Sequence, residues 1–175
     1  MADNFSAIYA SQLAGDTPSG PLKYIKRCIT FTEKTRYLFE INKGVTPKDT
    51  RKNPYAVNED VSMTKRKIPF ANMVYVGDGL TDIPCFSLVS AGVRGEPGGI
   101  TFGVFDPREK RSAKRIFQNF LVPGRVVSAN PPQYRRTDAL GSLIRSAVAS
   151  RCASIGIRRQ TATHLWKTVS SETAV

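Results

Sequence analysis

Two aspartates near the middle of the chain, Asp78 and Asp82, have types and spacing that suit a metal site. They lie in the segment 72–89, NMVYVGDGLTDIPCFSLV, four positions apart. Carboxylate oxygens are hard ligands of the kind that Mg²⁺ prefers, and Mg²⁺ commonly binds through one or two carboxylates together with water and a substrate phosphate. The pair therefore predicts a magnesium site.

The same segment predicts the local structure that would position these acids. A short apolar run breaks at a glycine-flanked aspartate and a second apolar pattern follows, which is typical of a strand, a tight turn and a helix. Gly77, Gly79 and Thr81 are expected to belong to a loop that binds the phosphate and the metal. Gly77 and Gly79 would let the backbone turn sharply and approach a ligand, and Thr81 would also cap the helix. The competing interpretation is that Gly-Asp-Gly is only a turn and that Asp82 only caps a helix.

The remaining elements indicate an α/β fold. A strand, a helix and a second strand in succession predict parallel pairing, and ligands bind beyond the carboxyl ends of such strands. We therefore expect a partial Rossmann-like, mainly parallel sheet with helices on both faces. The predicted strands are 5–10, 72–77 and 100–105, and the predicted helices run from 32 to a stop at Gly44, from 109 to 121 and from 137 to 155.

The domain organisation follows from composition. Residues 45–69 are polar, contain three prolines and show no sustained period, so they are predicted to form an inserted loop. Residues 1–130 are expected to form the α/β core around that loop. Residues 131–175 are expected to form a basic carboxyl-terminal helix and a frayed tail.

Charge and hydropathy limit the classes of function. The net charge is +12, and residues 107–175 hold 13 Lys and Arg against 3 Asp and Glu. A basic segment attracts polyanions, so a nucleic-acid-binding module is the alternative function, although no helix-turn-helix spacing or aromatic RNA-binding signature accompanies the charge. No apolar run is long enough for a membrane span, which predicts a cytoplasmic protein without a membrane partner.

The basic residues that motivate the nucleic-acid alternative are clustered toward the carboxyl end. They are Arg108, Lys110, Arg111, Lys114, Arg115, Arg135, Arg136, Arg158 and Arg159. A basic face is most often solvated surface, so nucleic acid is the less favoured partner.

The segment VYVGDGLTD at 74–82 resembles the fourth motif of the haloacid dehalogenase-like (HAD) superfamily, which supplies acidic magnesium ligands. The segments FTEKT at 31–35 and YLFEINKG at 37–44 resemble the third motif of the same superfamily, a lysine that opens a helix. Lys34 is the matching position, and Lys43 is the competing one. The resemblance implies an HAD-like core, Mg²⁺ as cofactor and hydrolysis of phosphate monoesters through an aspartyl-phosphate.

One part of the HAD pattern is absent from the sequence. The nucleophile of that superfamily is the first aspartate of Asp-x-Asp, and no Asp-x-Asp occurs in the 175 residues. The resemblance thus implies a core without its amino-terminal strand and nucleophile loop, inactive alone and acting on a small phosphorylated substrate when completed by an amino-terminal half. A truncated gene product, one half of a split enzyme and a degenerate, non-catalytic interaction fragment all fit this pattern.

Overall fold

The computed structural model describes residues 5–17, 19–93 and 97–172, with side chains as far as residue 161. Contacts divide the chain into two compact units, Met1–Pro69 and Phe70–Val175. This boundary differs from the expected one after residue 130, because the carboxyl-terminal helix packs on the same sheet as the segments that precede it. Each unit is described by itself.

The unit that begins at Phe70 is built on a parallel sheet of three strands in the order β3-β4-β5. Strand β3 is Val74–Gly77, β4 is Ile100–Val104 and β5 is Ser128–Asn130. Val74 pairs with Ile100 and Phe102 pairs with Ser128. The two strands predicted in this unit are confirmed with small changes of boundary, and the third, β5, was not predicted.

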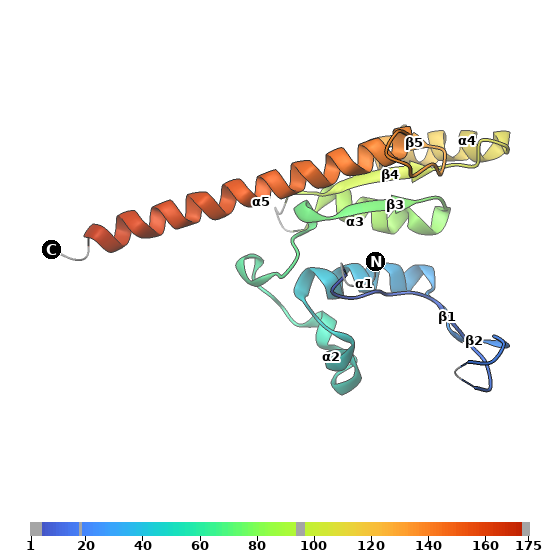
Figure 1. Ribbon diagram of the computed structural model, residues 1–175, viewed down its shortest axis with the longest axis horizontal. Coiled ribbons are helices and arrows are strands. Elements are labelled where there is room, and N and C mark those ends of the chain that lie inside the picture. Colours follow the sequence, from blue (N-terminus) through green and yellow to red (C-terminus); the bar gives the residue numbers. More distant parts are fainter. Residues whose placement is uncertain (1–4, 18, 94–96, 173–175) are drawn as a thin grey trace. The chain divides into compact units, whose positions relative to one another are not determined.

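Helices cover both faces of this sheet, because successive strand side chains point to opposite faces (Figure 1). On one face Tyr75 packs with buried Phe86 of α3 (Ile83–Ala91) and with Ile116 of α4 (Lys110–Ile116). The chain continues from α4 as a π-helical segment, Phe117–Leu121. On the other face the alternate strand residues Val74, Val76, Phe102 and Val104 pack against helix α5 (Ala139–Glu172).

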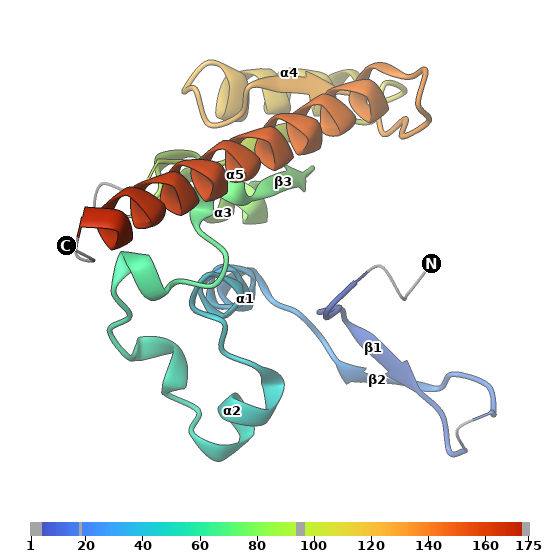
Figure 2. The ribbon, with the colours of Figure 1, turned by 60° about the vertical axis from the view of Figure 1, so that its left-hand side comes forward.

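Helix α5 is much longer than predicted. It runs to Glu172, so the expectation of a frayed tail from residue 158 is wrong (Figure 2). No proline interrupts this segment, and each backbone hydrogen bond of a helix is made within the helix itself, so it extends past the sheet. Arg151 Nη1 donates to the Ala71 carbonyl at 2.9 Å and Arg158 Nη2 to Asn72 Oδ1 at 3.0 Å. Within the described residues, no helix combines the length and the apolarity that crossing a membrane requires.

The amino-terminal unit contains a short antiparallel ribbon. Strand β1 (Gln12–Ala14) pairs with β2 (Tyr24–Arg27), and an ion pair between Asp16 and Lys23 joins the segments beyond them. The prediction of a strand at 5–10 is wrong: these residues pair with no other strand and are mostly exposed. An apolar run becomes a strand only when another strand supplies ladder partners, and the ribbon begins two residues later.

The helix predicted after residue 32 is confirmed as α1 (Phe31–Lys43). The Glu33 carboxylate accepts the Thr30 backbone N–H at 3.0 Å, which is one half of a capping box, and this contact lowers the pKa of Glu33. Gly44 ends the helix with φ of 76°, a left-handed conformation that glycine adopts without steric cost.

The segment 45–69 is less irregular than predicted. Helix α2 (Pro47–Lys52) begins at Thr46, whose backbone N–H donates to Asp49 Oδ2 at 2.8 Å. Two short 3₁₀ turns follow, at Ala56–Asn58 and Met63–Lys65. Periodicity could not reveal elements of three to six residues, because they are shorter than two helical turns.

Candidate functional site

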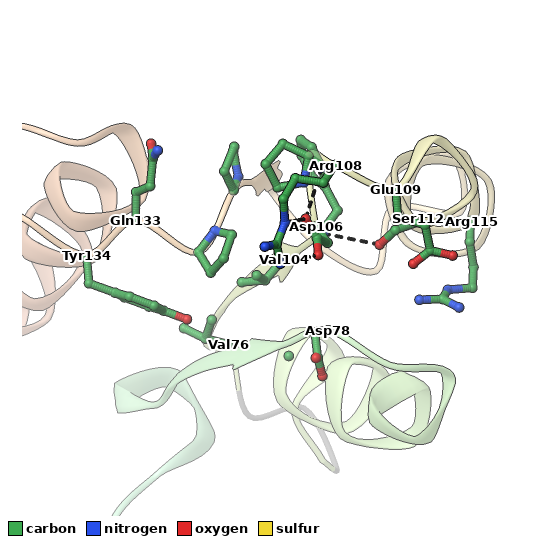
Figure 3. A pocket seen from close by; sticks show the side chains of 15 residues that line it. Val76, Asp78, Val104, Asp106, Arg108, Glu109, Ser112, Arg115, Gln133 and Tyr134 are labelled. Carbon is green, nitrogen blue, oxygen red and sulfur yellow. Dashed lines mark hydrogen bonds and ion pairs between the residues drawn. The ribbon is translucent and has the colours of Figure 1, made fainter.

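A hollow of about 570 Å³ lies where the three strands of the parallel sheet end (Figure 3). Asp78 follows β3, residues 106–109 follow β4 and residues 131–134 follow β5, and all of them line it. The carboxyl ends of parallel strands meet at one edge, where loops and helix starts converge on a ligand. Asp78 therefore lies at the strand end that its sequence predicted, with an exposed carboxylate.

Asp82 is buried and its carboxylate organises the loop that carries Asp78. Its Oδ2 accepts the backbone N–H groups of Asp78 at 3.1 Å and Gly79 at 3.0 Å, while Oδ1 accepts the hydroxyl of Tyr75 at 2.7 Å. Burial and the hydrogen bond to Asp82 raise the pKa of Tyr75, so this hydroxyl keeps its proton as a donor. Asp82 does point back toward Asp78 as predicted, but both of its oxygens accept hydrogen bonds from its own loop and strand.

The two glycines of the motif have different roles. A Cβ on Gly77 would lie 2.7 Å from Cγ of Asp82, so the missing side chain makes room for the buried carboxylate. Gly79 has an ordinary extended φ of −122°, so no left-handed turn requires glycine there. The packing of Asp82 therefore requires glycine at position 77 and not at position 79.

The prediction that Thr81 caps the motif helix is wrong. Thr81 lies inside a 3₁₀ turn, Leu80–Asp82, and the residue that precedes α3 is Asp82. Pro84 occupies the first turn of α3, where its missing N–H has no intrahelical partner. The 3₁₀ turn brings Asp82 close enough to its own loop for the hydrogen bonds described above.

A second carboxylate at the pocket, Asp106, is held by Arg108. Asp106 Oδ1 accepts Nε of Arg108 at 3.0 Å and Oδ2 accepts Nη2 at 2.8 Å, and the backbone N–H of Arg108 also donates to Oδ1. The buried hydroxyl of Ser112 accepts the Asp106 N–H at 3.2 Å. The contacts with Arg108 lower the pKa of Asp106 to about 2, and the side-chain hydrogen bonds are the main cause.

This contact gives a testable pH dependence. A carboxyl group whose pKa is lower in the folded chain stabilises the fold above its ordinary pKa and loses that contribution as the pH falls through the folded value. We expect the Asp106 carboxyl carbon to titrate near pH 2 by NMR, and Arg108→Ala to move the midpoint up toward the ordinary value of about 3.9. Arg111→Ala, in the helix α4 that follows, serves as the matched control, and an unchanged midpoint in Arg108→Ala would contradict the assignment.

The two candidate lysines lie in the amino-terminal unit, whereas both motif aspartates lie in the other unit. Lys34 is in the first turn of α1, as predicted, and is half-buried. Lys43 Nζ donates to the backbone carbonyls of Val57 at 2.7 Å and Glu59 at 2.6 Å. Lys43 thereby holds the segment that follows α2.

Two of the residues that line the pocket were not singled out as site residues by the sequence. Tyr134 comes from the loop after β5 and Arg115 from α4. A strand at 128–130 followed by Pro131-Pro132 would have placed that loop at the same edge as Asp78. The strand was missed because it has only three residues.

Several basic residues are committed to contacts within the chain. Arg108 binds Asp106 and Arg158 binds Asn72. These two side chains therefore already have partners within the chain and are less available to a polyanion. Among the residues with described side chains, no group of three or more His, Cys, Asp or Glu is close enough to hold a metal by itself. A metal at this site would therefore need oxygen ligands from water or substrate.

Comparison with known proteins adds one relative. The chain is 34% identical over 91 residues to an uncharacterized protein of Borreliella burgdorferi. The match covers 52% of this chain and 28% of that protein, so the chain spans only part of the relative's length. No protein-family model and no solved structure matches the chain.

Proposed function

We propose that this chain is the metal-binding portion of a magnesium-dependent phosphohydrolase of the HAD-like superfamily. The observation that supports the proposal most directly is the position of Asp78. It lies at the carboxyl end of a parallel strand, on an open hollow, in a loop whose backbone N–H groups donate to the buried carboxylate of Asp82. A carboxylate at this edge of an α/β sheet is suited to a metal and a phosphate.

The residues present fit Mg²⁺ as a weakly bound ion. Asp78 offers an exposed carboxylate, while Asp82 contributes by orienting the loop. Mg²⁺ tolerates such a small protein contribution because it retains several waters and binds substrate phosphate directly. When bound, the ion would supply positive charge beside the phosphoryl oxygens.

For Lys34 the resemblance to the third motif is the basis of the proposal that its positive charge neutralises the transferring phosphoryl group. The proposed function assigns the nucleophile to a segment outside these 175 residues, because the sequence contains no Asp-x-Asp. The sheet is compatible with a further strand: among the described residues β3 pairs with β4 alone, although both faces of β3 pack against helices. A strand covered on both faces is typical of a sheet interior.

A metal titration and an activity assay test this proposal together. We expect calorimetry to show weak Mg²⁺ binding, and electron paramagnetic resonance to show binding of Mn²⁺ as a substitute for Mg²⁺. Because Asp78→Asn removes a direct ligand, we expect it to weaken the affinity for each ion at least about tenfold. Glu109→Gln is the matched control, because it removes an exposed acid from the same hollow. Binding that is unchanged in Asp78→Asn would contradict the site.

The chain alone is expected to hydrolyse p-nitrophenyl phosphate no faster than a heat-treated sample, because covalent phosphoryl transfer has no first step without the attacking carboxylate. Fusion to the in-phase upstream coding segment, if that segment carries Asp-x-Asp, should give Mg²⁺-dependent turnover that Lys34→Ala reduces strongly. Robust metal-dependent turnover by the chain alone would mean that one of its own acids is the nucleophile.

A further inference from the structure

We propose that the hollow at the strand ends is built for a phosphate monoester whose alcohol is a planar ring, with Tyr134 stacking on the ring and Arg115 binding the phosphate. This inference deepens the proposed function and rests on it. Figure 3 shows the arrangement: Tyr134 reaches in over Val76 from one side and Arg115 from the opposite side, with Asp78 between them in this view.

Tyr134 is exposed, yet its backbone is fixed. The residue is 59% exposed, so its ring is accessible to a ligand. Gly141 N–H donates to the Gln133 carbonyl at 3.2 Å, and a Cβ on Gly141 would lie 2.7 Å from the Tyr134 carbonyl oxygen. The loop thus packs directly on the first turn of α5, where only glycine leaves enough space.

A second pair of contacts closes the same loop. The Arg135 N–H donates to Asp138 Oδ2 at 2.9 Å, and the Asp138 N–H donates to the Arg135 carbonyl at 3.0 Å. An aromatic ring on such a fixed backbone loses little conformational entropy when a ligand stacks on it. Pro131 and Pro132, which also line the hollow, have no backbone N–H and add a stiff apolar wall on the same side.

Arg115 supplies the charge that the phosphate needs. The other arginine of the hollow, Arg108, uses Nε and Nη2 on Asp106, whereas Arg115 forms no ion pair with any residue whose side chain is described. A guanidinium group binds two phosphate oxygens at once through parallel N–H donors. Arg115 would therefore bind the phosphate directly and Asp78 would bind it through a metal, while Tyr134 faces the ring.

The shape of the hollow agrees with a substrate of this size. Its volume of about 570 Å³ accommodates a phosphate and a ring system. The charged side, with Arg115, and the aromatic side, with Tyr134, lie apart, which favours an elongated ligand. An acyclic phosphate such as glycerol 2-phosphate would reach Arg115 but leave Tyr134 without a partner. The predicted preference is therefore for the aryl ester.

Ligand binding tests this inference without turnover. Saturation-transfer NMR on the full chain, at saturating Mg²⁺, would compare p-nitrophenyl phosphate, glycerol 2-phosphate and inorganic phosphate. We expect the affinity for the aryl ester to be at least about fivefold higher than that for glycerol 2-phosphate, because stacking of one ring on an aromatic side chain strengthens binding by at least this factor. Tyr134→Ala should abolish this advantage, Tyr134→Phe should retain it, and neither should change the binding of inorganic phosphate.

Arg115 has its own readout. Arg115→Gln should weaken all three phosphates alike, whereas Arg111→Gln, on the same helix but outside the hollow, should weaken none. A preference for the aryl ester that persists in Tyr134→Ala would overturn this inference. So would the absence of that preference in the parent chain, if Mg²⁺ binding still depends on Asp78. Either outcome leaves the proposed function standing. Loss of Asp78-dependent Mg²⁺ binding overturns the proposed function instead.

Discussion

Replacing Phe86 with alanine is expected to lower the free energy of unfolding of the unit that begins at Phe70 by about 3–5 kcal/mol. Phe86 is 0% exposed and lies at the centre of the cluster between the sheet and helices α3 and α4. Its ring packs at 5.4 Å from that of Tyr75 and at 4.9 Å from that of Phe120, measured between centroids. Truncation removes both aromatic contacts and leaves a cavity that surrounding helices fill only in part.

The matched control is Phe117→Ala. Phe117 is 58% exposed and lies three residues before Phe120 in the same helical segment, so its truncation should cost less than about 1 kcal/mol. Because a chain of two units need not unfold in one step, the measurement is native-state hydrogen exchange of the β4 amides. Equal destabilisation by the two substitutions would show that the cluster is not the core of this unit.

Replacing Asp82 with alanine is expected to lower the free energy of unfolding by about 3 kcal/mol, because it leaves three donors without their acceptor. Each unsatisfied buried group costs about 1–3 kcal/mol, and less where water enters. The donors are the N–H groups of Asp78 and Gly79 and the hydroxyl of Tyr75. Asp82 is only 3% exposed, so solvent replaces little of what is lost. Amide exchange at residues 78 and 79 should accelerate more than exchange elsewhere in the sheet.

Two further variants separate the parts of this network. Tyr75→Phe removes one of the three hydrogen bonds and should cost about 1 kcal/mol. Asp78→Asn changes an exposed carboxylate and should leave the unfolding free energy within about 0.5 kcal/mol of the parent chain. If Asp82→Ala were as mild as Asp78→Asn, the loop that carries Asp78 would be held by something other than the buried carboxylate.

The two experiments are connected through Tyr75. Its ring packs edge-on against Phe86, and its hydroxyl donates to Asp82. A cavity at Phe86 should therefore also loosen the Asp78 loop, so that Mg²⁺ binding weakens in Phe86→Ala even though Phe86 does not line the hollow. Phe117→Ala should leave Mg²⁺ binding unchanged.

Local chemistry in the sequence was sufficient to predict several elements. The glycine after α1, the apolar run of β3 and the strand-helix-strand order around Asp78 each depend on residues close together in the chain. Such signals act through backbone dihedrals, capping and side-chain period, which residues close together in the chain determine. Asp78 was for this reason predicted correctly to lie at the end of a parallel strand.

Contacts between distant residues decided what the sequence could not. The apolar run at 5–10 resembles a strand but has no ladder partner, whereas three residues at 128–130 form one because β4 lies beside them. Asp82 was predicted from its spacing as a second ligand, and only the structure shows that Tyr75 and two backbone N–H groups donate to its oxygens. Strand pairing, burial and hydrogen-bond partners depend on residues that are close in space and distant in the chain. The type and spacing of residues therefore predicted the edge of the sheet where a ligand would bind. Only the tertiary structure determined which side chains face that edge.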